Sequence, residues 1–363
     1  MFDCIIVGAG PAGSAAGYHL AKRGRSVLIL EKASLPRRKP CGGGVSPAIQ
    51  AWFDIDFTPV VEVNVLKIRY TWKLEDPVET EVTTPMWMVQ RDVFDQYLVE
   101  QAQKQGAELK DGTEVTGIQF QSDHWQVKTP GEVFQGRYLI GADGAKGPMA
   151  QWLGFKARKQ RQGLVLESHH VPDQAAAFEL GLVKNGSIWC FPKANGTSIS
   201  ATTFIGGESK SLSKDLVNYA SQFGYGSDSP MDEHPLCLWD GDQKLHTQNA
   251  VIVGEAASLV DPLLAEGIRP AIFSGVKAAE AIDGALGGVA DALETYTRVI
   301  IEQWGEDFMW AGRLAGAFYR FPGIGYKAFV KFPTATKMMA KILCGKLRYG
   351  DVANRAIKRL KPF

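Results

Sequence analysis

The chain has 363 residues, of which 45% are hydrophobic and 22% are charged, and its formal net charge is +1. This length corresponds to two or three domains, and the composition excludes a disordered, a collagen-like or a generally nucleic-acid-coating protein. The charge is unevenly distributed, because 11 of the 40 Lys and Arg residues but only one acid, Asp351, lie from Arg320 onward. An acidic body therefore precedes a basic tail.

The five cysteines are scattered, with no CxxC pair and no histidine at ligand spacing. We therefore expect neither a disulfide framework nor a metal site. The apolar stretch from Cys4 to Gly10 is too short for a secretory signal, and no apolar run reaches the length of a membrane span. The sequence predicts a cytoplasmic protein.

The N-terminal segment combines two apolar runs, Cys4 to Val7 and Val27 to Leu30, with a glycine-rich turn and a helical pattern between them. Such a unit binds an adenine dinucleotide, with its pyrophosphate at the helix N-terminus and its ribose at an acid that ends the second strand. This motif alone leaves NAD and FAD open. The candidate cofactor-binding residues here are Gly8, Gly10, Ala12, Gly13, Glu31 and Lys32.

Two later apolar strands end in turns that ordinary NAD-dependent dehydrogenases do not need. Tyr138 to Gly141 leads to Asp143 and Gly144, and Ala250 to Val253 leads to Gly254 and Glu255. A Pro and a second turn follow, and they add Pro262, Gly267 and Ile268 to the candidate cofactor-binding residues.

The order of these three turns resembles the flavin-dependent group that includes para-hydroxybenzoate hydroxylase. The resemblance implies that FAD lies extended across them, with the acid of the third turn near the ribityl and pyrophosphate region and the following helix N-terminus facing the isoalloxazine. The chain departs from the group at Glu255, where Asp is usual, and at Ala265, where Gly is common before Glu266. The longer Glu255 side chain must fold back or bond through water.

A further segment of that group, RxxFDxxL, is matched by Arg91, Phe94, Asp95 and Leu98. The resemblance implies that Arg91 reaches the flavin phosphate or ribityl. Read only as structure, Phe94 and Leu98 form a core pair at i, i+4 spacing and Arg91 lies on the surface.

The loop from Pro36 to Ser46 contains Cys41, Gly42 and Gly43 after three bases. An electropositive, accessible setting of this kind makes a thiol functional. The spacing PxxxPCGG is similar to that of the geranylgeranyl reductase family, flavoproteins that saturate isoprenoid double bonds. The resemblance implies that this loop packs beside the flavin and that the three residues belong to the catalytic site.

A second feature similar to that family is the segment from Trp189 to Lys193, which matches YxWxFPK except that Ser187 replaces the Tyr. We expect an apolar pocket wall for an alkene chain here. Glu167 and His169 are alternatives to Cys41 as proton donor, although they could equally be an ordinary exposed pair on an edge strand. The candidate substrate-pocket residues are Glu167, His169, Trp189, Phe191 and Phe204.

The fold class expected is α/β: an FAD-binding Rossmann-like domain with an inserted mixed β-sheet substrate domain and a C-terminal helical region. Because the nucleotide motifs are dispersed, the FAD-binding domain is discontinuous. It comprises residues 1–50, 86–150 and 246–290. The substrate domain comprises 51–85 and 151–245, and the helical, basic region is 291–363.

The function expected is FAD-dependent reduction of isoprenoid C=C bonds, by hydride from the N5 position of reduced flavin and a proton from an acid or water. No second GxGxxG is present, so NADPH binding transiently or reduced ferredoxin is the expected donor. The alternatives are a flavin monooxygenase acting on an aromatic or polyprenyl-quinone ring, a non-redox isoprenoid cyclase and an electron relay.

The basic tail interleaves cationic and apolar residues in segments broken at Pro322 and Pro333. This pattern favours peripheral contact with an anionic membrane surface, at which a prenyl substrate also resides. The alternative is a helical cap whose lysines form a solvated face. Nucleic acid is not an expected partner.

Overall fold

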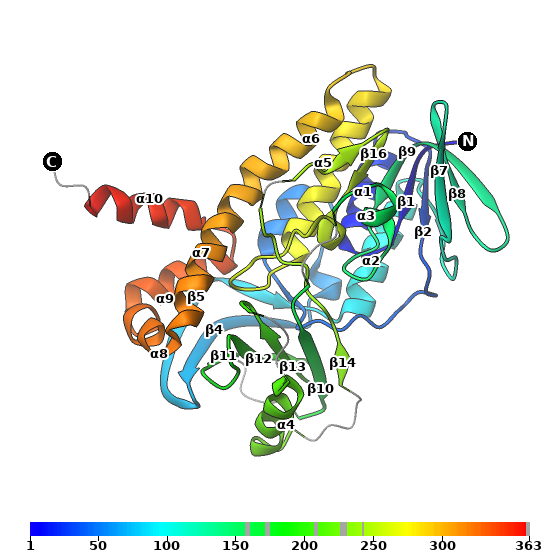
Figure 1. Cartoon of the computed structure of the whole chain (residues 1–363). Coiled ribbons are helices and arrows are strands. Elements are labelled where there is room, and N and C mark those ends of the chain that lie inside the picture. The colour runs from blue at the N-terminus through cyan, green and yellow to red at the C-terminus, as the bar shows by residue number, and fades with distance from the viewer. Residues whose placement is uncertain (157–159, 171–174, 207–209, 226–230, 242, 361–363) are drawn as a thin grey trace.

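The structure is a computed structural model of residues 1–363, of which residues 157–159, 171–174, 207–209, 226–230, 242 and 361–363 and the side chains of 355–360 are not described. The molecule is built on two large β-sheets with helices between and around them (Figure 1). This arrangement confirms the expected α/β class with a Rossmann-like domain, a mixed sheet and C-terminal helices.

The first sheet carries the nucleotide motifs, in the order β15-β16-β9-β1-β2-β6, with the hairpin β7-β8 attached to β9. From β16 to β6 all neighbours are parallel, as a βαβ crossover requires. Its strands are β1 (Phe2–Val7), β2 (Val27–Leu30), β6 (Glu108–Lys110), β7 (Gly117–Gln121), β8 (His124–Lys128), β9 (Val133–Gly141), β15 (His246–Thr247) and β16 (Ala250–Ile252).

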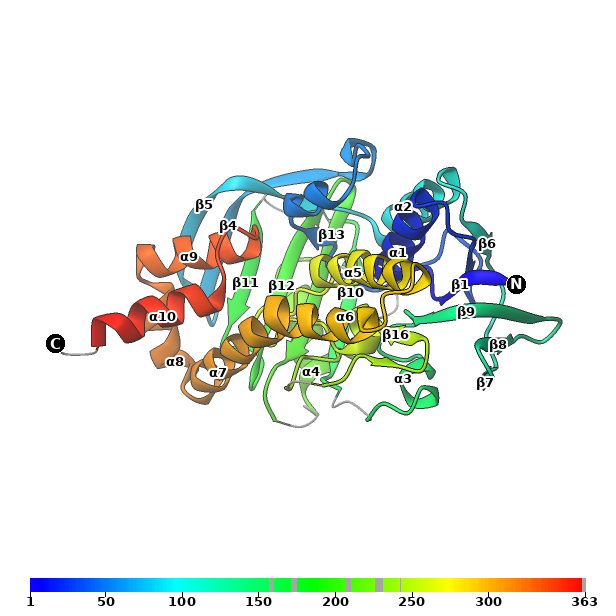
Figure 2. The same ribbon diagram turned by 90° about the horizontal axis from the view of Figure 1, so that it is seen from above.

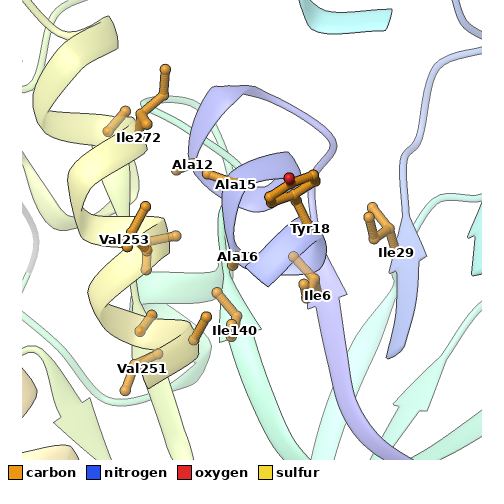
Figure 3. Close-up of a cluster of buried hydrophobic side chains, with 14 of the residues drawn as sticks. Ile6, Ala12, Ala15, Ala16, Tyr18, Ile29, Ile140, Val251, Val253 and Ile272 are labelled. Atoms are coloured by element: carbon orange, nitrogen blue, oxygen red, sulfur yellow. The ribbon is translucent and has the colours of Figure 1, made fainter. Parts of the chain in front are cut away.

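Helix α1 (Pro11–Lys22) connects β1 to β2 and packs between α2 (Arg91–Lys104) and α5 (Ile268–Leu286). Ala12, Ala15 and Ala16 of α1 are buried in the core that also contains Ile272 of α5 (Figure 3). Small side chains on α1 let the two helices approach closely, and this brings the N-terminal ends of both helices to the same edge of the sheet.

The second sheet has the order β14-β10-β13-β12-β11-β4-β5-β3. It is mixed, because β11 and β4 are parallel and the other neighbours are antiparallel. One face packs against α4 (Leu212–Gln222) and the other against the C-terminal helices. Its strands are β3 (Gly44–Val45), β4 (Val63–Trp72), β5 (Glu75–Met88), β10 (Gly163–Ser168), β11 (Ala176–Leu180), β12 (Gly186–Lys193), β13 (Gly196–Thr203) and β14 (Asp232–Glu233).

The strands of the second sheet cross two of the sequence-based domain limits. β3 pairs with β5 already at Gly44, before residue 51, and β5 continues to Met88, beyond residue 85. The loop that carries Cys41 is therefore attached directly to the second sheet. Short helices elsewhere are η1 (Pro47–Trp52), η2 (Thr58–Val60), α3 (Met149–Trp152) and η3 (Gly254–Ala257).

The C-terminal part runs as a series of helices along the molecule, away from the first sheet (Figure 2). Pro322 and Pro333 are the first residues of α8 and α9, where a missing N–H costs no helical hydrogen bond. No helix in the described residues is long and apolar enough to cross a membrane. The helices are α6 (Ala292–Ile300), η4 (Ile301–Gly305), α7 (Glu306–Arg320), α8 (Pro322–Gly325), η5 (Tyr326–Val330), α9 (Pro333–Leu343) and α10 (Tyr349–Leu360).

Candidate active site

A cavity of about 580 Å³ lies between the two sheets, and every nucleotide motif contributes to its wall. The lining is completed by the basic residues of the cysteine loop, Arg37, Arg38 and Lys39, and by residues of β10 and β12. The sequence-predicted residues that line it are Gly8, Gly10, Ala12, Glu31, Lys32, Cys41, Gly42, Arg91, Asp143, Gly144, Trp189, Glu255, Gly267 and Ile268. Other predicted residues are not among those lining it: Gly13, Gly43, Gly254, Pro262, Glu167, His169, Phe191 and Phe204.

The first turn presents the N-terminus of α1 to this cavity. A Cβ at Gly13 would lie 1.9 Å from the carbonyl oxygen of Gly8, so glycine is required where the helix meets the strand. Glu31, at the end of β2, accepts hydrogen bonds from the backbone N–H groups of Ala9 (2.9 Å) and Ala33 (3.1 Å). The carboxylate is thereby held beside the cavity in a fixed orientation.

A buried chain of charges connects the first motif to Arg91. Arg37 lies 3.4 Å from a Glu31 carboxylate oxygen and donates to Asp95 at 3.0 Å. Arg91 donates two hydrogen bonds of 2.9 Å to the same Asp95, which is fully buried. The purely structural interpretation of Arg91 as a surface residue is therefore wrong. The guanidinium groups of Arg37 and Arg91 both bind Asp95, close to the N-terminus of α1.

Asp143 follows β9 and holds an unpaired polar atom at the cavity. Its Oδ2 accepts a hydrogen bond from the Met149 N–H at 2.8 Å, whereas its buried Oδ1 has no partner. Burial raises the pKa of Asp143 to about 6. An orphaned carboxylate oxygen of this kind is suited to a ligand with hydroxyl donors.

Glu255 folds back, as its extra length required. Its Oε1 accepts the Cys237 N–H at 3.3 Å, and its Oε2 lies 3.7 Å from Nε2 of His234. The other ring nitrogen of His234 is 3.5 Å from the Lys39 ammonium. Burial raises the pKa of Glu255 and lowers the pKa values of His234 and Lys39.

The third motif is organised by Asp261, which is buried and accepts hydrogen bonds from the N–H groups of Leu263 (2.7 Å) and Leu264 (3.0 Å). Ala265 adopts a left-handed conformation (φ 49°), which explains why glycine suits this position. The turn ends at Gly267, the N-cap of α5, so the N–H groups of the first turn of α5 lie at the cavity.

The cysteine loop lies on the second sheet. The Gly43 N–H points to Cys41 Sγ at 3.4 Å, and Ser198 Oγ lies 3.4 Å from the Cys41 carbonyl oxygen. A Cβ at Gly42 would lie 2.7 Å from the ring of Phe191, so only glycine permits this contact. Beneath the loop, the buried Lys193 donates to the Val89 carbonyl at 2.6 Å, and burial lowers the pKa of its ammonium.

Aromatic rings form the face of the second sheet next to the cavity. Trp189 stacks on Phe191 with centroids 5.9 Å apart, and it contacts Phe204 at 6.1 Å. Phe204 in turn stacks on Tyr319 of α7 at 5.1 Å. Ser187, which replaces the family's Tyr, accepts a hydrogen bond from the Trp189 indole N–H at 2.9 Å.

The two alternative proton donors lie outside this wall. Glu167 accepts a hydrogen bond from Ser198 at 2.9 Å and lies behind the cysteine loop, and burial raises its pKa. His169 is exposed beyond the end of β10. Of the three, only Cys41 contributes to the cavity lining.

Three features of the site were not predicted from the sequence: His234, Arg37 as an ion-pair partner and Lys193 as a support of the loop. His234 belongs to no motif and follows a two-residue strand, so no local pattern marks it. Lys193 is the last residue of the YxWxFPK match. Its position at the end of an apolar strand was the available signal, because a buried lysine needs an acceptor for its ammonium group.

These residues fit FAD. The α1 N-terminus with Arg37 and Arg91 would hold the pyrophosphate, Glu31 the adenine ribose, Asp143 and Glu255 the hydroxyl-bearing linker, and the α5 N-terminus the ring. No group of three or more His, Cys, Asp or Glu residues in the described part of the chain is arranged to hold a metal ion.

Comparisons with known proteins identify an FAD-binding family. Residues 58–222 match the family model of an FAD binding domain, and residues 6–37 match an NAD(P)-binding Rossmann-like domain. The chain is 31% identical over 312 residues to a geranylgeranyl diphosphate reductase of Rhodobacter capsulatus, covering 77% of this chain and 74% of that protein. It is 26% identical over 312 residues to a digeranylgeranylglycerophospholipid reductase of Methanocaldococcus jannaschii, covering 79% and 78%.

The fold is also that of a solved geranylgeranyl bacteriochlorophyll reductase-like protein of Thermoplasma acidophilum, with a TM-score of 0.79 and 21% identity over 88% of this chain and 87% of that one. Fold and site together define an FAD-dependent oxidoreductase. The chain belongs to the geranylgeranyl reductase family.

Proposed function

We propose that the protein reduces C=C bonds of an isoprenoid chain. The observation that carries this proposal is the position of Cys41, which lines the cofactor cavity while its neighbour Gly42 contacts Phe191 of the aromatic face. An alkene chain offers only apolar surface, and the row formed by Phe191, Trp189 and Phe204 suits it. This position supports a role of the Cys41 thiol as the proton donor between an apolar substrate and the cofactor.

The reaction adds a hydride and a proton across one double bond. Bound FAD in its reduced form supplies the hydride. The Cys41 thiol donates the proton to the other carbon, and the sulfur left behind faces the Gly43 N–H and the charge of Arg91. Water restores the proton after the saturated product leaves, so the residue is unchanged over a cycle.

The electrons would come from NADPH or reduced ferredoxin. The chain has one dinucleotide turn, which the FAD occupies in this proposal, so a nicotinamide donor would bind only transiently. Arg38, Lys39 and Lys146 line the cavity and provide cationic groups for a phosphate-bearing or acidic donor.

The proposal is tested by incubating the FAD-loaded protein with dithionite and geranylgeranyl diphosphate, with and without oxygen, followed by mass spectrometry. We expect a product heavier by two hydrogens for each bond reduced in the absence of oxygen, and no oxygen-containing product when air is admitted. Gain of an oxygen atom would identify a monooxygenase, and an isomer of unchanged mass would identify a cyclase. Parallel reactions with NADPH or reduced ferredoxin in place of dithionite identify the donor.

A further inference from the structure

Four large apolar side chains are exposed within one short segment of the C-terminal region. Phe321 is 61% exposed, Ile324 68%, Phe329 55% and Phe332 59%. We call these four residues the apolar tip. Exposed apolar side chains scattered singly are ordinary, but four within twelve residues mark an interaction surface.

The segment that carries the apolar tip packs on the second sheet. Tyr326 and Val330, which lie between the tip residues, are buried. The Tyr326 hydroxyl donates to the carbonyl of Tyr70 at 3.2 Å, and its ring lies 6.1 Å from Trp72. The π-helical turn η5 therefore buries Tyr326 and Val330 and leaves Phe329 exposed. Helix α8 and the segment after it lie on the side of the molecule opposite the β7-β8 hairpin (Figure 1).

The surroundings of the apolar tip are basic. No Asp or Glu occurs between Arg320 and Gly350. Lys331 forms an ion pair with Asp76 at 2.5 Å, whereas Lys327, Lys337 and Lys341 are exposed. A second copy of the chain would bring two such basic surfaces together, so the charge disfavours self-association and favours an anionic partner.

We propose that the apolar tip inserts into the surface of an anionic phospholipid bilayer, with Lys327, Lys337 and Lys341 at the level of the headgroups. Interleaved aromatic and cationic side chains on a short helical segment match the layered chemistry of that surface. The basic residues alone would attach the protein to the membrane through charge. The exposed apolar residues of 321–332 would add the contact with the lipid interior.

The tip also connects to the cavity through aromatic rings. Tyr70 and Trp72 lie two positions apart on β4, Tyr70 stacks on Phe178 at 5.3 Å, and Phe178 contacts Trp189 at 5.7 Å. Tyr70 and Phe178 are buried, so this row links the tip to the Trp189 wall by side-chain packing.

Vesicle co-sedimentation tests the proposal on the FAD-loaded protein, using phosphatidylcholine vesicles with and without phosphatidylglycerol. We expect binding only with phosphatidylglycerol, reduced by high salt. The double variant Ile324→Glu with Phe329→Glu should lose about tenfold in binding. The control is Leu66→Glu with Val289→Glu, because these side chains are similarly exposed, at 57% and 51%, but lie outside the tip.

Unfolding curves and the FAD spectrum verify that both double variants fold. The proposal is overturned if the tip variant sediments like the wild type, if the control loses as much, or if no anionic vesicle binds. A change from dimer to monomer in the tip variant, without vesicle binding, would assign the surface to a second copy instead. Binding is measured without substrate, so a failure to reduce isoprenoids would leave this result intact.

Discussion

Tyr349 of α10 donates a hydrogen bond of 2.7 Å to Asp261, the buried acid of the third flavin motif. The two residues are separated by 88 positions in the chain. The contact is reinforced nearby, where Arg269 forms two hydrogen bonds of 2.8 Å with Glu266 and reaches the Ile342 carbonyl at 3.4 Å. The C-terminal helices are therefore part of the support of the flavin-facing turn.

Replacing Tyr349 by Phe removes this hydrogen bond and leaves a buried carboxylate oxygen of Asp261 without its donor. We expect a loss of about 1–3 kcal/mol in the free energy of unfolding and a shift in the absorption spectrum of bound flavin. The matched control is Tyr296→Phe, which loses a buried bond of 2.8 Å to the Ile252 carbonyl. It should lose stability without the spectral shift. Equal spectra in the two variants would contradict the coupling.

Asp261 should make stability depend on pH. Burial raises its pKa from the ordinary 3.8 to about 6, so the folded protein binds this proton more tightly than the unfolded chain does. Its contribution to stability is complete below pH 3.8 and is lost as the pH rises through 6, by at most about 3 kcal/mol. Denaturant titrations between pH 4 and pH 8 should show this slope in the wild type and a smaller slope in Asp261→Asn. Identical slopes would refute the assignment.

Glu31→Ala should weaken FAD binding by about tenfold or more, because the carboxylate that would accept the ribose hydroxyls is removed. Gly10→Val should also lower occupancy, since it adds bulk at the α1 N-terminus. Binding is measured by fluorescence quenching on reconstitution of the apoprotein. Glu108→Ala, an exposed acid on β6, is the control. Fully yellow protein from both site variants would show that the dinucleotide binds elsewhere.

Cys41→Ser should retain the fold and FAD but slow alkene saturation by about 100-fold, because a hydroxyl is a far weaker acid than a thiol. The rate of flavin reoxidation by substrate in a single anaerobic turnover measures this step. Cys190→Ser serves as the control, since Cys190 faces α4 on the other side of the same sheet. Unchanged turnover in Cys41→Ser would assign the residue to loop structure.

Phe204→Leu should change the preference for chain length. Phe204 fills the space between Trp189 of the cavity wall and Tyr319, so a smaller side chain extends the apolar end of the site. With prenyl diphosphates of increasing length, kcat/KM should shift toward the longer members. Phe223→Leu, at the residue that follows α4, should leave the ratios unchanged. The same ratios in Phe204→Leu would exclude it from the substrate path.

The local sequence by itself determined the cofactor class and the family. The glycine turn with Glu31, the turn at Asp143 and Gly144, and the loop of Cys41 are encoded in consecutive residues, because tight turns and close approach demand glycine at particular positions. The mixed sheet and the helices after Ile268 also follow from local periodicity.

Only the tertiary structure decided which distant groups meet. Arg37 reaches Asp95 on α2, His234 lies between Lys39 and Glu255, and Tyr349 bonds Asp261, although no spacing in the chain indicates these contacts. In the C-terminal region, too, the sequence does not show which apolar residues are buried, because Tyr326 and Phe329 are similar aromatic residues three positions apart. Tyr326 is buried against the second sheet and Phe329 is exposed, since burial depends on the surface that a helix packs against.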